Sequence, residues 1–316
     1  MSPGKVLVTG GAGFVGSHVC EAYLVQGWDV TALDNLVTGR VGNVPRDVRF
    51  LEMDIRDENL RRVFRDGRFD VVSHHAAQVD VRASVTRPRH DAAVNIDGLL
   101  NLLECALEFG LERFVFVSSG GAIYGESAGL PIPRSASKRP VSPYGVSKLA
   151  SEYYLRAFRE LSGLEYVALR YANVYGPRQD PHGEAGVVAI FARTILDGDR
   201  LVVFGDGEQT RDFVFVRDVA AANLLMTDAD LPDSRRLDEV AFNVGSGDQT
   251  SINTLAAAMI DIAGRAVEIV REPARPGDPM HNCLDCSETR ALGWAPVHSL
   301  EAGLRETWEF IAEEAA

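Results

Sequence analysis

The stretch that decides the fold is Thr9-Gly-Gly-Ala-Gly-Phe-Val-Gly-Ser17, which joins an apolar, strand-like run to a helix-like segment. Three of its four glycines, Gly10, Gly13 and Gly16, are spaced three residues apart. Glycines at this spacing permit a tight turn and let backbone N–H groups approach a pyrophosphate. A helix that opens near Phe14 and Val15 would direct its positive end at that phosphate. The stretch therefore predicts a dinucleotide-binding βαβ unit.

The first half of the chain alternates short β-branched runs with longer amphipathic runs. The predicted strands are Val6–Val8, Asp29–Leu33, Arg49–Met53, Val71–His74, Phe114–Ser118 and Tyr166–Arg170. The predicted helices are Phe14–Val25, Glu58–Arg65, Ala92–Glu108 and Tyr144–Leu161. Strands that are apolar along their whole length and alternate with helices predict a parallel sheet covered on both faces. The fold class is α/β, a Rossmann-type doubly wound sheet.

The second half is less regular. Further helices are predicted near Val187–Leu196, Asp218–Met226, Ile252–Ala263 and Leu300–Glu313. We expect residues 1–174 to form a dinucleotide-binding domain. Residues 175–316 would form a smaller α/β substrate-binding lobe, with some segments returning to the sheet domain.

Composition and charge narrow the function classes. The 316 residues carry a formal net charge of -13, which disfavours nucleic acid and anionic membranes as partners. No apolar run approaches membrane-spanning length. Cys20 and Cys105 lie in apolar helical patterns, and the pair Cys283 and Cys286 lacks the further ligands of a metal site. We expect a cytoplasmic protein with reduced cysteines and no metal.

Polar and small residues at the strand ends are candidates to hold the cofactor. Asp34 ends the second strand, where a carboxylate would accept hydrogen bonds from a ribose and repel a 2′-phosphate, which favours NAD over NADP. A simple turn aspartate is the alternative, and Arg40 is a mild counter-argument. For Asp54 an ordinary turn is almost as good an explanation. The candidates at these ends are Asp34, Asn35, Gly39, Asp54, Ile55, Ala76 and Ala77.

The segment Pro143-Tyr144-Gly-Val-Ser-Lys148 carries the chemistry. A tyrosine and a lysine four residues apart share one face of a helix. An ammonium beside a phenol, helped by a nicotinamide cation, should lower the phenol pKa from about 10 towards neutrality. The pair would then remove the proton from a secondary alcohol while hydride leaves for the cofactor. A solvated helix face is the alternative for such a spacing by itself.

Taken in order, these segments resemble the extended short-chain dehydrogenases/reductases, and within them the UDP-glucose 4-epimerases. The resemblance rests on the glycine turn, Asp34, Ser118-Ser-Gly-Gly-Ala-Ile-Tyr-Gly125, the Tyr144/Lys148 pair and Arg170-Tyr-Ala-Asn-Val-Tyr-Gly-Pro177. It runs from about Lys5 to beyond Trp294. It implies an isomerase that holds NAD and epimerises a UDP-sugar through a transient 4-keto intermediate.

The resemblance also implies contacts for each ligand. Those to the cofactor would include Asn95, Ser118 and Tyr171. Those to the UDP-sugar would come from Asn173, Val187, Arg211, Arg275 and Asp278, with the arginines on the diphosphate. A helix-face amide is the alternative for Asn95. Surface ion pairs with Asp212 or Asp278 are the alternative for the arginines.

One position departs from the family pattern. Gly120 stands where the family has a serine or threonine that hydrogen-bonds the reacting sugar oxygen. We expect Ser119 to supply that hydroxyl, or else Tyr144 acts without it. A dehydratase or decarboxylase is disfavoured because Gly121 and Ala122 replace the acids that those enzymes carry. A UDP-glucuronate 4-epimerase and a non-catalytic NAD-binding protein stay open.

The sugar and the assembly are expected by analogy. Asn282 occupies a position where a bulkier residue closes the sugar pocket of some family members, so an N-acetyl group would fit and UDP-N-acetylglucosamine would be accepted. The helices near Ala92–Glu108 and Tyr144–Leu161 resemble those that pair across a homodimer. Their apolar residues could equally pack within one chain.

Overall fold

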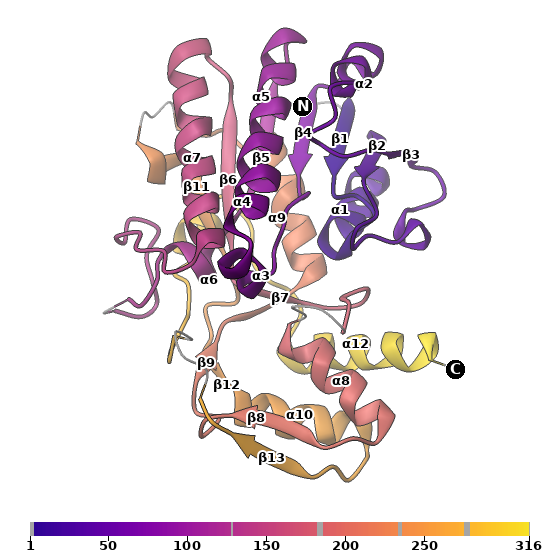
Figure 1. Cartoon of the computed structure of the whole chain (residues 1–316), viewed down its shortest axis with the longest axis vertical. Coiled ribbons are helices and arrows are strands. Elements are labelled where there is room, and N and C mark those ends of the chain that lie inside the picture. The colour runs from indigo at the N-terminus through magenta and orange to yellow at the C-terminus, as the bar shows by residue number, and fades with distance from the viewer. Residues whose placement is uncertain (1–2, 128, 182–185, 233–235, 275–278, 316) are drawn as a thin grey trace.

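A computed structural model describes residues 3–127, 129–181, 186–232, 236–274 and 279–315 (Figure 1). Its centre is a seven-stranded sheet in which every pair of neighbours is parallel. From edge to edge the strands are β11 (Ala241–Val244), β6 (Tyr166–Tyr171), β5 (Arg113–Ser119), β4 (Val71–His74), β1 (Lys5–Thr9), β2 (Asp29–Asp34) and β3 (Arg49–Glu52). The predicted doubly wound parallel sheet is confirmed.

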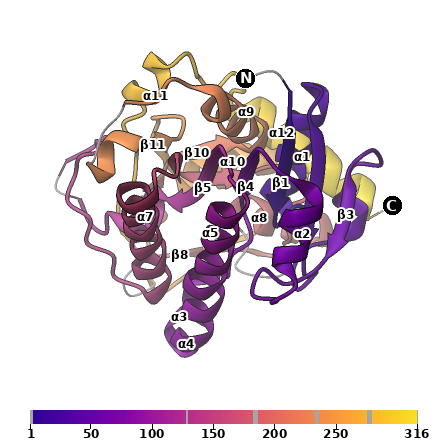
Figure 2. The same ribbon diagram turned by 90° about the horizontal axis from the view of Figure 1, so that it is seen from above.

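Helices cover both faces of this sheet (Figure 2). One face packs on α1 (Phe14–Val25) and α9 (Val216–Asp228), where Tyr23 and Met226 are fully buried. The other face packs on α2 (Leu60–Gly67), α5 (Gly98–Glu108) and α7 (Pro143–Ser162). The two apolar cores result from strands that bury side chains in both directions.

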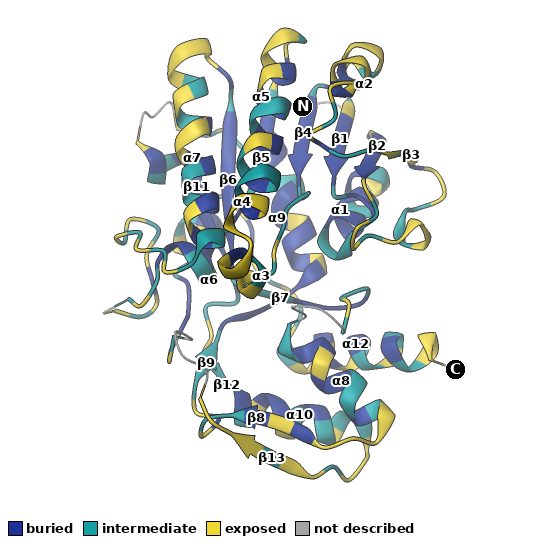
Figure 3. Cartoon of the chain, viewed as in Figure 1, coloured by how far each residue is buried: buried dark blue, intermediate teal, exposed yellow. Residues whose placement is uncertain are grey.

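The remaining elements form a smaller layer below the carboxyl ends of the strands (Figure 1). Its core lies among α8 (Val187–Asp197), α10 (Ile252–Ala263), α12 (Leu300–Glu314) and the parallel pair β8 (Leu201–Phe204) and β13 (Ile269–Glu272). Two further pairs connect this layer to the sheet: β7 (Asn173–Tyr175) with β10 (Phe213–Phe215), and β9 (Thr210–Arg211) with β12 (Thr250–Ser251). The outer strand β13 is largely exposed (Figure 3).

The helices predicted from periodicity are confirmed, with one difference in the middle of the chain. The helix expected from Ala92 is preceded by α3 (Val81–Thr86) and α4 (Pro88–Ala92), and a π-helical turn, Ala93–Asp97, separates α4 from α5. Strands β7 to β13, among them the edge strand β11 of the central sheet, are absent from the prediction, as are the short elements α6 (Gly120–Ile123), α11 (Ser287–Ala291), η1 (Val41–Asn43) and η3 (Leu237–Val240). Within the described ranges, no helix combines the length and the apolarity needed to cross a bilayer.

Candidate active site

The glycine turn brings β1, α1 and the end of β4 into contact. Gly10 has a φ of +69°, and a Cβ there would lie 2.6 Å from the Ala76 backbone nitrogen. A Cβ on Gly16 would lie 2.1 Å from the Gly10 carbonyl oxygen. Helix α1 starts after Gly13 with no side-chain cap, so its first N–H groups, those of Phe14 and Val15, point out of the helix end. A phosphate is the natural partner of such a helix end.

Asp34 lies beside this turn in a fixed orientation. Its buried carboxylate accepts hydrogen bonds from the backbone N–H of Ala12 (3.1 Å) and of Leu36 (2.8 Å). A Cβ on Gly39 would come within 2.7 Å of the Asp34 Oδ1, so the loop passes directly over the carboxylate. The structure therefore brings Asp34, Gly39 and the glycine turn together, as the βαβ prediction requires.

The neighbouring candidates Asn35 and Asp54 bond to each other. Asn35 Nδ2 donates to Asp54 Oδ2 at 2.9 Å, and the Arg56 guanidinium donates to both oxygens of the same carboxylate at 2.8 Å. The hydrogen bonds from Arg56 hold the pKa of Asp54 well below its usual range. Ile55 is buried against Gly98 of α5. The Asp54 carboxylate is thus already part of an ion pair.

The tyrosine and lysine lie on the first two turns of α7. Ser142 caps this helix by accepting a hydrogen bond from the Gly145 N–H at 3.1 Å. The Lys148 Nζ is buried, donates to the Val117 carbonyl oxygen at 2.8 Å and lies 5.9 Å from the centre of the Tyr144 ring. Burial lowers the pKa of Lys148 to about 8. The predicted pair therefore joins a buried lysine to a half-buried tyrosine.

The pKa of the Tyr144 phenol is dominated by burial. Burial raises the pKa of Tyr144 to about 12, and a side-chain hydrogen bond with Ser119 acts in the opposite direction. The expected fall towards neutrality, which included a nicotinamide cation, stays a prediction, and the protein groups by themselves act in the opposite direction. Burial disfavours the phenolate, while the Lys148 ammonium is bonded to Val117 and lies nearly 6 Å from the ring centre.

Packing explains why a glycine replaces the family's hydroxyl residue. A Cβ on Gly120 would lie 2.5 Å from Leu284 Cδ1 and 3.2 Å from the Tyr171 carbonyl oxygen. Leu284 is fully buried, so it has little room to move away. The side chain of Ser119, one residue earlier, interacts with the Tyr144 phenol and acts to lower its pKa. The structure thus brings Ser119, Tyr144 and Lys148 together.

The other candidates for cofactor contact have different surroundings. Asn95 is buried, with its amide hydrogen-bonded to both the N–H and the carbonyl oxygen of Gln78, next to Ala76 and Ala77. The Ser118 hydroxyl donates to Glu152 Oε1 at 2.6 Å. Tyr171 turns its side chain to the opposite face of the sheet, where its hydroxyl bonds to Asn223 of α9. The structure does not bring the Tyr171 side chain to Tyr144.

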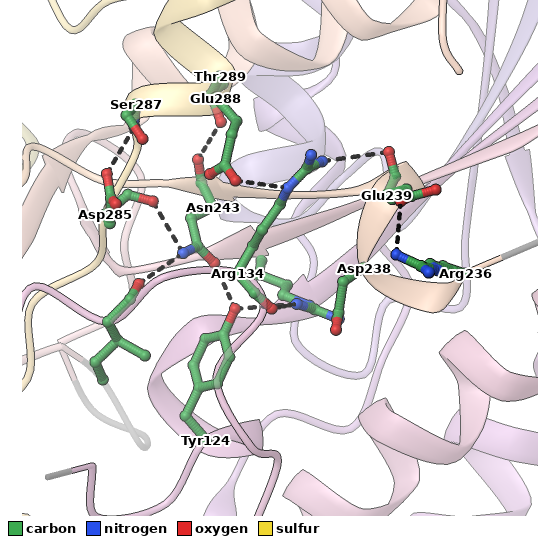
Figure 4. Close-up of polar contacts among 12 residues, drawn as sticks. Tyr124, Arg134, Arg236, Asp238, Glu239, Asn243, Asp285, Ser287, Glu288 and Thr289 are labelled. Carbon is green, nitrogen blue, oxygen red and sulfur yellow. Dashed lines mark hydrogen bonds and ion pairs between the residues drawn. The ribbon is translucent and has the colours of Figure 1, made fainter. Parts of the chain in front are cut away.

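A buried polar network holds the segment between β5 and α7. Arg170 and Glu152 are fully buried and form a two-pronged ion pair, with Nε–Oε1 at 3.0 Å and Nη2–Oε2 at 2.6 Å. Arg170 Nη1 also donates to the Tyr124 hydroxyl at 3.0 Å. Tyr124 in turn donates to Asn243 Oδ1 at 2.7 Å (Figure 4). Our sequence reasoning missed Glu152, although it lies eight residues after Tyr144 on the same helix face.

The substrate candidates gather around residues 210–212. The Asn173 N–H donates to the Asp212 carbonyl oxygen at 2.9 Å, and the Asn282 N–H donates to the Thr210 carbonyl oxygen at 3.2 Å. Arg211 lies between these two attachments. Asn282 is buried and its Oδ1 has no hydrogen-bond partner within the described residues.

The remaining substrate candidates lie elsewhere. Val187 is the first residue of α8, which starts after Gly186 without a side-chain cap. Arg275 and Asp278 lie outside the described residues.

A glycine turn beside a strand-end carboxylate, with a half-buried tyrosine and a buried lysine on a helix packed against the same sheet, defines a dinucleotide-dependent site that oxidises and reduces an alcohol carbon. Residues 6–245 match the model of the NAD dependent epimerase/dehydratase family, and the chain belongs to this family.

Three solved structures are similar over almost the whole chain. The UDP-glucose 4-epimerase of Thermotoga maritima, solved with UDP-glucose, is 44% identical, has a TM-score of 0.94, and the match covers 99% of this chain and 100% of that one. The Thermus thermophilus UDP-glucose 4-epimerase, solved with NAD, is 44% identical with a TM-score of 0.91 and coverages of 97% and 98%. The UDP-N-acetylglucosamine 4-epimerase of Methanobrevibacter ruminantium, solved with UDP-N-acetylmuramic acid, is 35% identical with a TM-score of 0.92 and coverages of 99% and 100%. The sequence-based resemblance to the UDP-glucose 4-epimerases is confirmed.

Proposed function

We propose that this protein is an isomerase that inverts C4 of a UDP-hexose, through a transient 4-keto sugar, with NAD as the retained cofactor. The observation that carries the proposal is the grouping of half-buried Ser119 and Tyr144 with the buried Lys148 at the start of α7. The close similarity to epimerases solved with UDP-glucose and with NAD supports the same reaction.

The residues of the glycine turn, the start of α1 and Asp34 fit NAD. The pyrophosphate would lie on the N–H groups of Phe14 and Val15 at the uncapped start of α1, where the glycines leave room. The Asp34 carboxylate would accept hydrogen bonds from the adenosine ribose and would repel a 2′-phosphate. Bound NAD would supply the acceptor, and then the donor, for the hydride at the sugar C4.

Tyr144 would handle the proton. Its phenol oxygen takes the proton of the sugar 4-hydroxyl and later returns it, with the Ser119 hydroxyl positioned to bond the same oxygens. Burial raises the pKa of Tyr144 to about 12, so removal of the sugar proton by the phenolate needs positive charge beside the phenol. Lys148 and a cationic nicotinamide are the groups that would supply it.

The substrate lobe would hold the UDP part while the sugar turns. Asn173 and Arg211, which are brought close by the 210–212 segment, would bind the sugar nucleotide together with Arg275 and Asp278. The start of α8 at Val187 would face the diphosphate. The proposal thus includes two domains: residues 1–174 would bind the cofactor, and residues 175–316 would bind the substrate.

Two finer properties belong to the same proposal. Leu107 of α5 and Val146 and Tyr153 of α7 expose 41%, 51% and 53% of their surface, and we expect these helices to pair across a homodimer. Light scattering of a Tyr153→Asp variant would reveal a monomer if this face is the interface. The free cysteines suit the reducing cytoplasm.

The test is to incubate the purified protein with UDP-galactose, UDP-N-acetylgalactosamine and UDP-glucuronate separately, without added NAD, and to separate the products by anion exchange. Formation of the C4 epimer of either of the first two sugars supports the proposal, and Tyr144→Phe is the matched inactive control. The ratio of their rates reports whether the site at Asn282 accepts an N-acetyl group. Conversion of UDP-glucuronate alone would favour that alternative, and no conversion despite bound NAD would indicate a binding protein.

A further inference from the structure

A second carboxylate lies next to Lys148 and is not part of the reaction described above. Asp91, on α4, is fully buried. Its Oδ2 accepts a hydrogen bond from Ser147 Oγ at 2.5 Å, and its Oδ1 accepts from Gln78 Nε2 at 2.9 Å and from Asn95 Nδ2 at 3.1 Å. Every partner donates, so the contacts are those of an ionised carboxylate.

The partners of Asp91 are all neutral. None of the ion pairs within the described residues includes it. Glu152, one turn beyond Lys148 on α7, is equally buried, but Arg170 neutralises it through two hydrogen bonds. A buried carboxylate without a cation is costly even when it is hydrogen-bonded. Asp91 therefore needs a positive charge nearby that Glu152 does not.

Lys148 is a buried cation on the helix that carries the Ser147 hydrogen bond to Asp91. It follows Ser147 directly in the chain, and helices α4 and α7 pack against each other. Its Nζ bonds to a neutral carbonyl, that of Val117, and so also lacks an ion-pair partner within the described residues. Two buried groups of opposite charge, each with only neutral hydrogen-bond partners, attract each other more strongly in the low-dielectric interior than they would in water.

We propose that Asp91 is a positioning residue of the epimerase reaction, whose buried negative charge keeps Lys148 protonated beside Tyr144. This inference rests on the proposed function for its catalytic consequence. The effect on Lys148 agrees, since Asp91 is the first of the groups that raise the pKa of Lys148 against burial. The same charge also raises the pKa of Tyr144, so the help that Asp91 gives to the phenolate comes through the Lys148 proton. The same carboxylate fixes Asn95 and Ser147, so it connects the cofactor side of the site to α7.

The other titratable groups around Lys148 do not replace Asp91. Tyr144 and Glu152 lie on its own helix, and the Glu152 charge is balanced by Arg170. His74 and His75, at the end of β4, have pKa values lowered by burial and by Lys148 itself, so they are neutral at physiological pH. Asp91 is the acid on the α4 side that has no cation of its own.

The first test is the pH profile of kcat/KM for wild type, Asp91→Asn and Ser147→Ala. The alkaline limb reports loss of the Lys148 proton, and removal of the Asp91 charge should move it down by about one pH unit, with roughly tenfold lower activity at about pH 9. Ser147→Ala removes a hydrogen bond but keeps the carboxylate, so its limb should coincide with that of wild type. Equal shifts in the two variants, or none in Asp91→Asn, would overturn the proposal.

The second test uses unfolding and needs no turnover, so it is decided even if the proposed epimerase activity fails. Urea midpoints are compared for wild type, Asp91→Asn, Lys148→Met and the double variant. Asp91→Asn should lower the midpoint in the wild-type background and raise it in the Lys148→Met background, where the carboxylate has lost its cation. If Asp91→Asn alone does not fold, a double variant more stable than Lys148→Met supports the coupling. A double variant that is no more stable overturns it.

Discussion

Gly120 offers a sharp test of the packing argument for the active site. In Gly120→Ala the new Cβ would lie 2.5 Å from Leu284 Cδ1, 3.0 Å from Leu284 Cδ2 and 3.2 Å from the Tyr171 carbonyl oxygen. Leu284 is fully buried, so the strain has to be relieved inside the core. Overpacking of this kind costs about 1–3 kcal/mol.

The adjacent glycine supplies the control. In Gly121→Ala the nearest atom to the new Cβ is Ser119 Oγ at 3.9 Å, and the residue lies on the same short helix, α6. This substitution should be neutral or stabilise by about 0.4–1 kcal/mol, because alanine restricts the unfolded chain. The two variants should therefore differ by about 1–4 kcal/mol in urea denaturation followed by circular dichroism.

A third variant identifies the neighbour responsible. Leu284→Ala removes the two nearest atoms that the new Cβ would meet and leaves only the Tyr171 carbonyl oxygen, so Gly120→Ala should cost less in that background than in wild type. Equal stability of Gly120→Ala and Gly121→Ala would refute the reasoning, and the absence of the family's hydroxyl would then need an explanation other than packing.

Three further outcomes are expected. Ser119→Ala should reduce kcat by about 10²–10³ while NAD stays bound, because one positioned hydrogen bond to the reacting oxygens is lost, and an unchanged kcat would exclude that role. Glu152→Ala should destabilise the fold by up to about 3–5 kcal/mol in urea, since it removes the buried partner of Arg170 and leaves that guanidinium only its ion pair with the less buried Asp238. Glu301→Ala, which breaks an exposed pair, should cost less than about 1 kcal/mol. His74 has a folded-state pKa lowered by burial, so its contribution to stability is present above about pH 6.5 and is lost as the pH falls below it, at about 1.4 kcal/mol per pH unit. Urea midpoints of His74→Gln should accordingly depend less steeply on pH than those of wild type, and parallel curves would contradict the assignment.

The sequence could also have predicted on which face of the sheet several side chains lie. Alternation along β6 places Tyr166 and Arg170 on the α7 face and Tyr171 on the α9 face. Period-two reasoning would therefore have removed the Tyr171 side chain from the cofactor candidates. It would also have placed Ser118 opposite Arg170, its register partner, in the Glu152 network.

The sequence by itself determined which motifs follow which elements along the chain. These are the glycine turn after β1, the carboxylate at the end of β2, and the tyrosine–lysine pair on α7. These features depend on residues at most a few positions apart, because strand alternation, helix periodicity and turn chemistry are local. For the same reason their boundaries agree with the structure to within a few residues at most sites.

Only the tertiary structure decided what surrounds the reacting groups. Leu284 fills the space next to Gly120 from 164 residues further along the chain, and Asp91 meets Ser147 across 56 residues. Burial, not the neighbouring ammonium, sets the direction of the Tyr144 pKa. Desolvation and packing depend on every element that reaches a point in space, so no local pattern in the sequence specifies them.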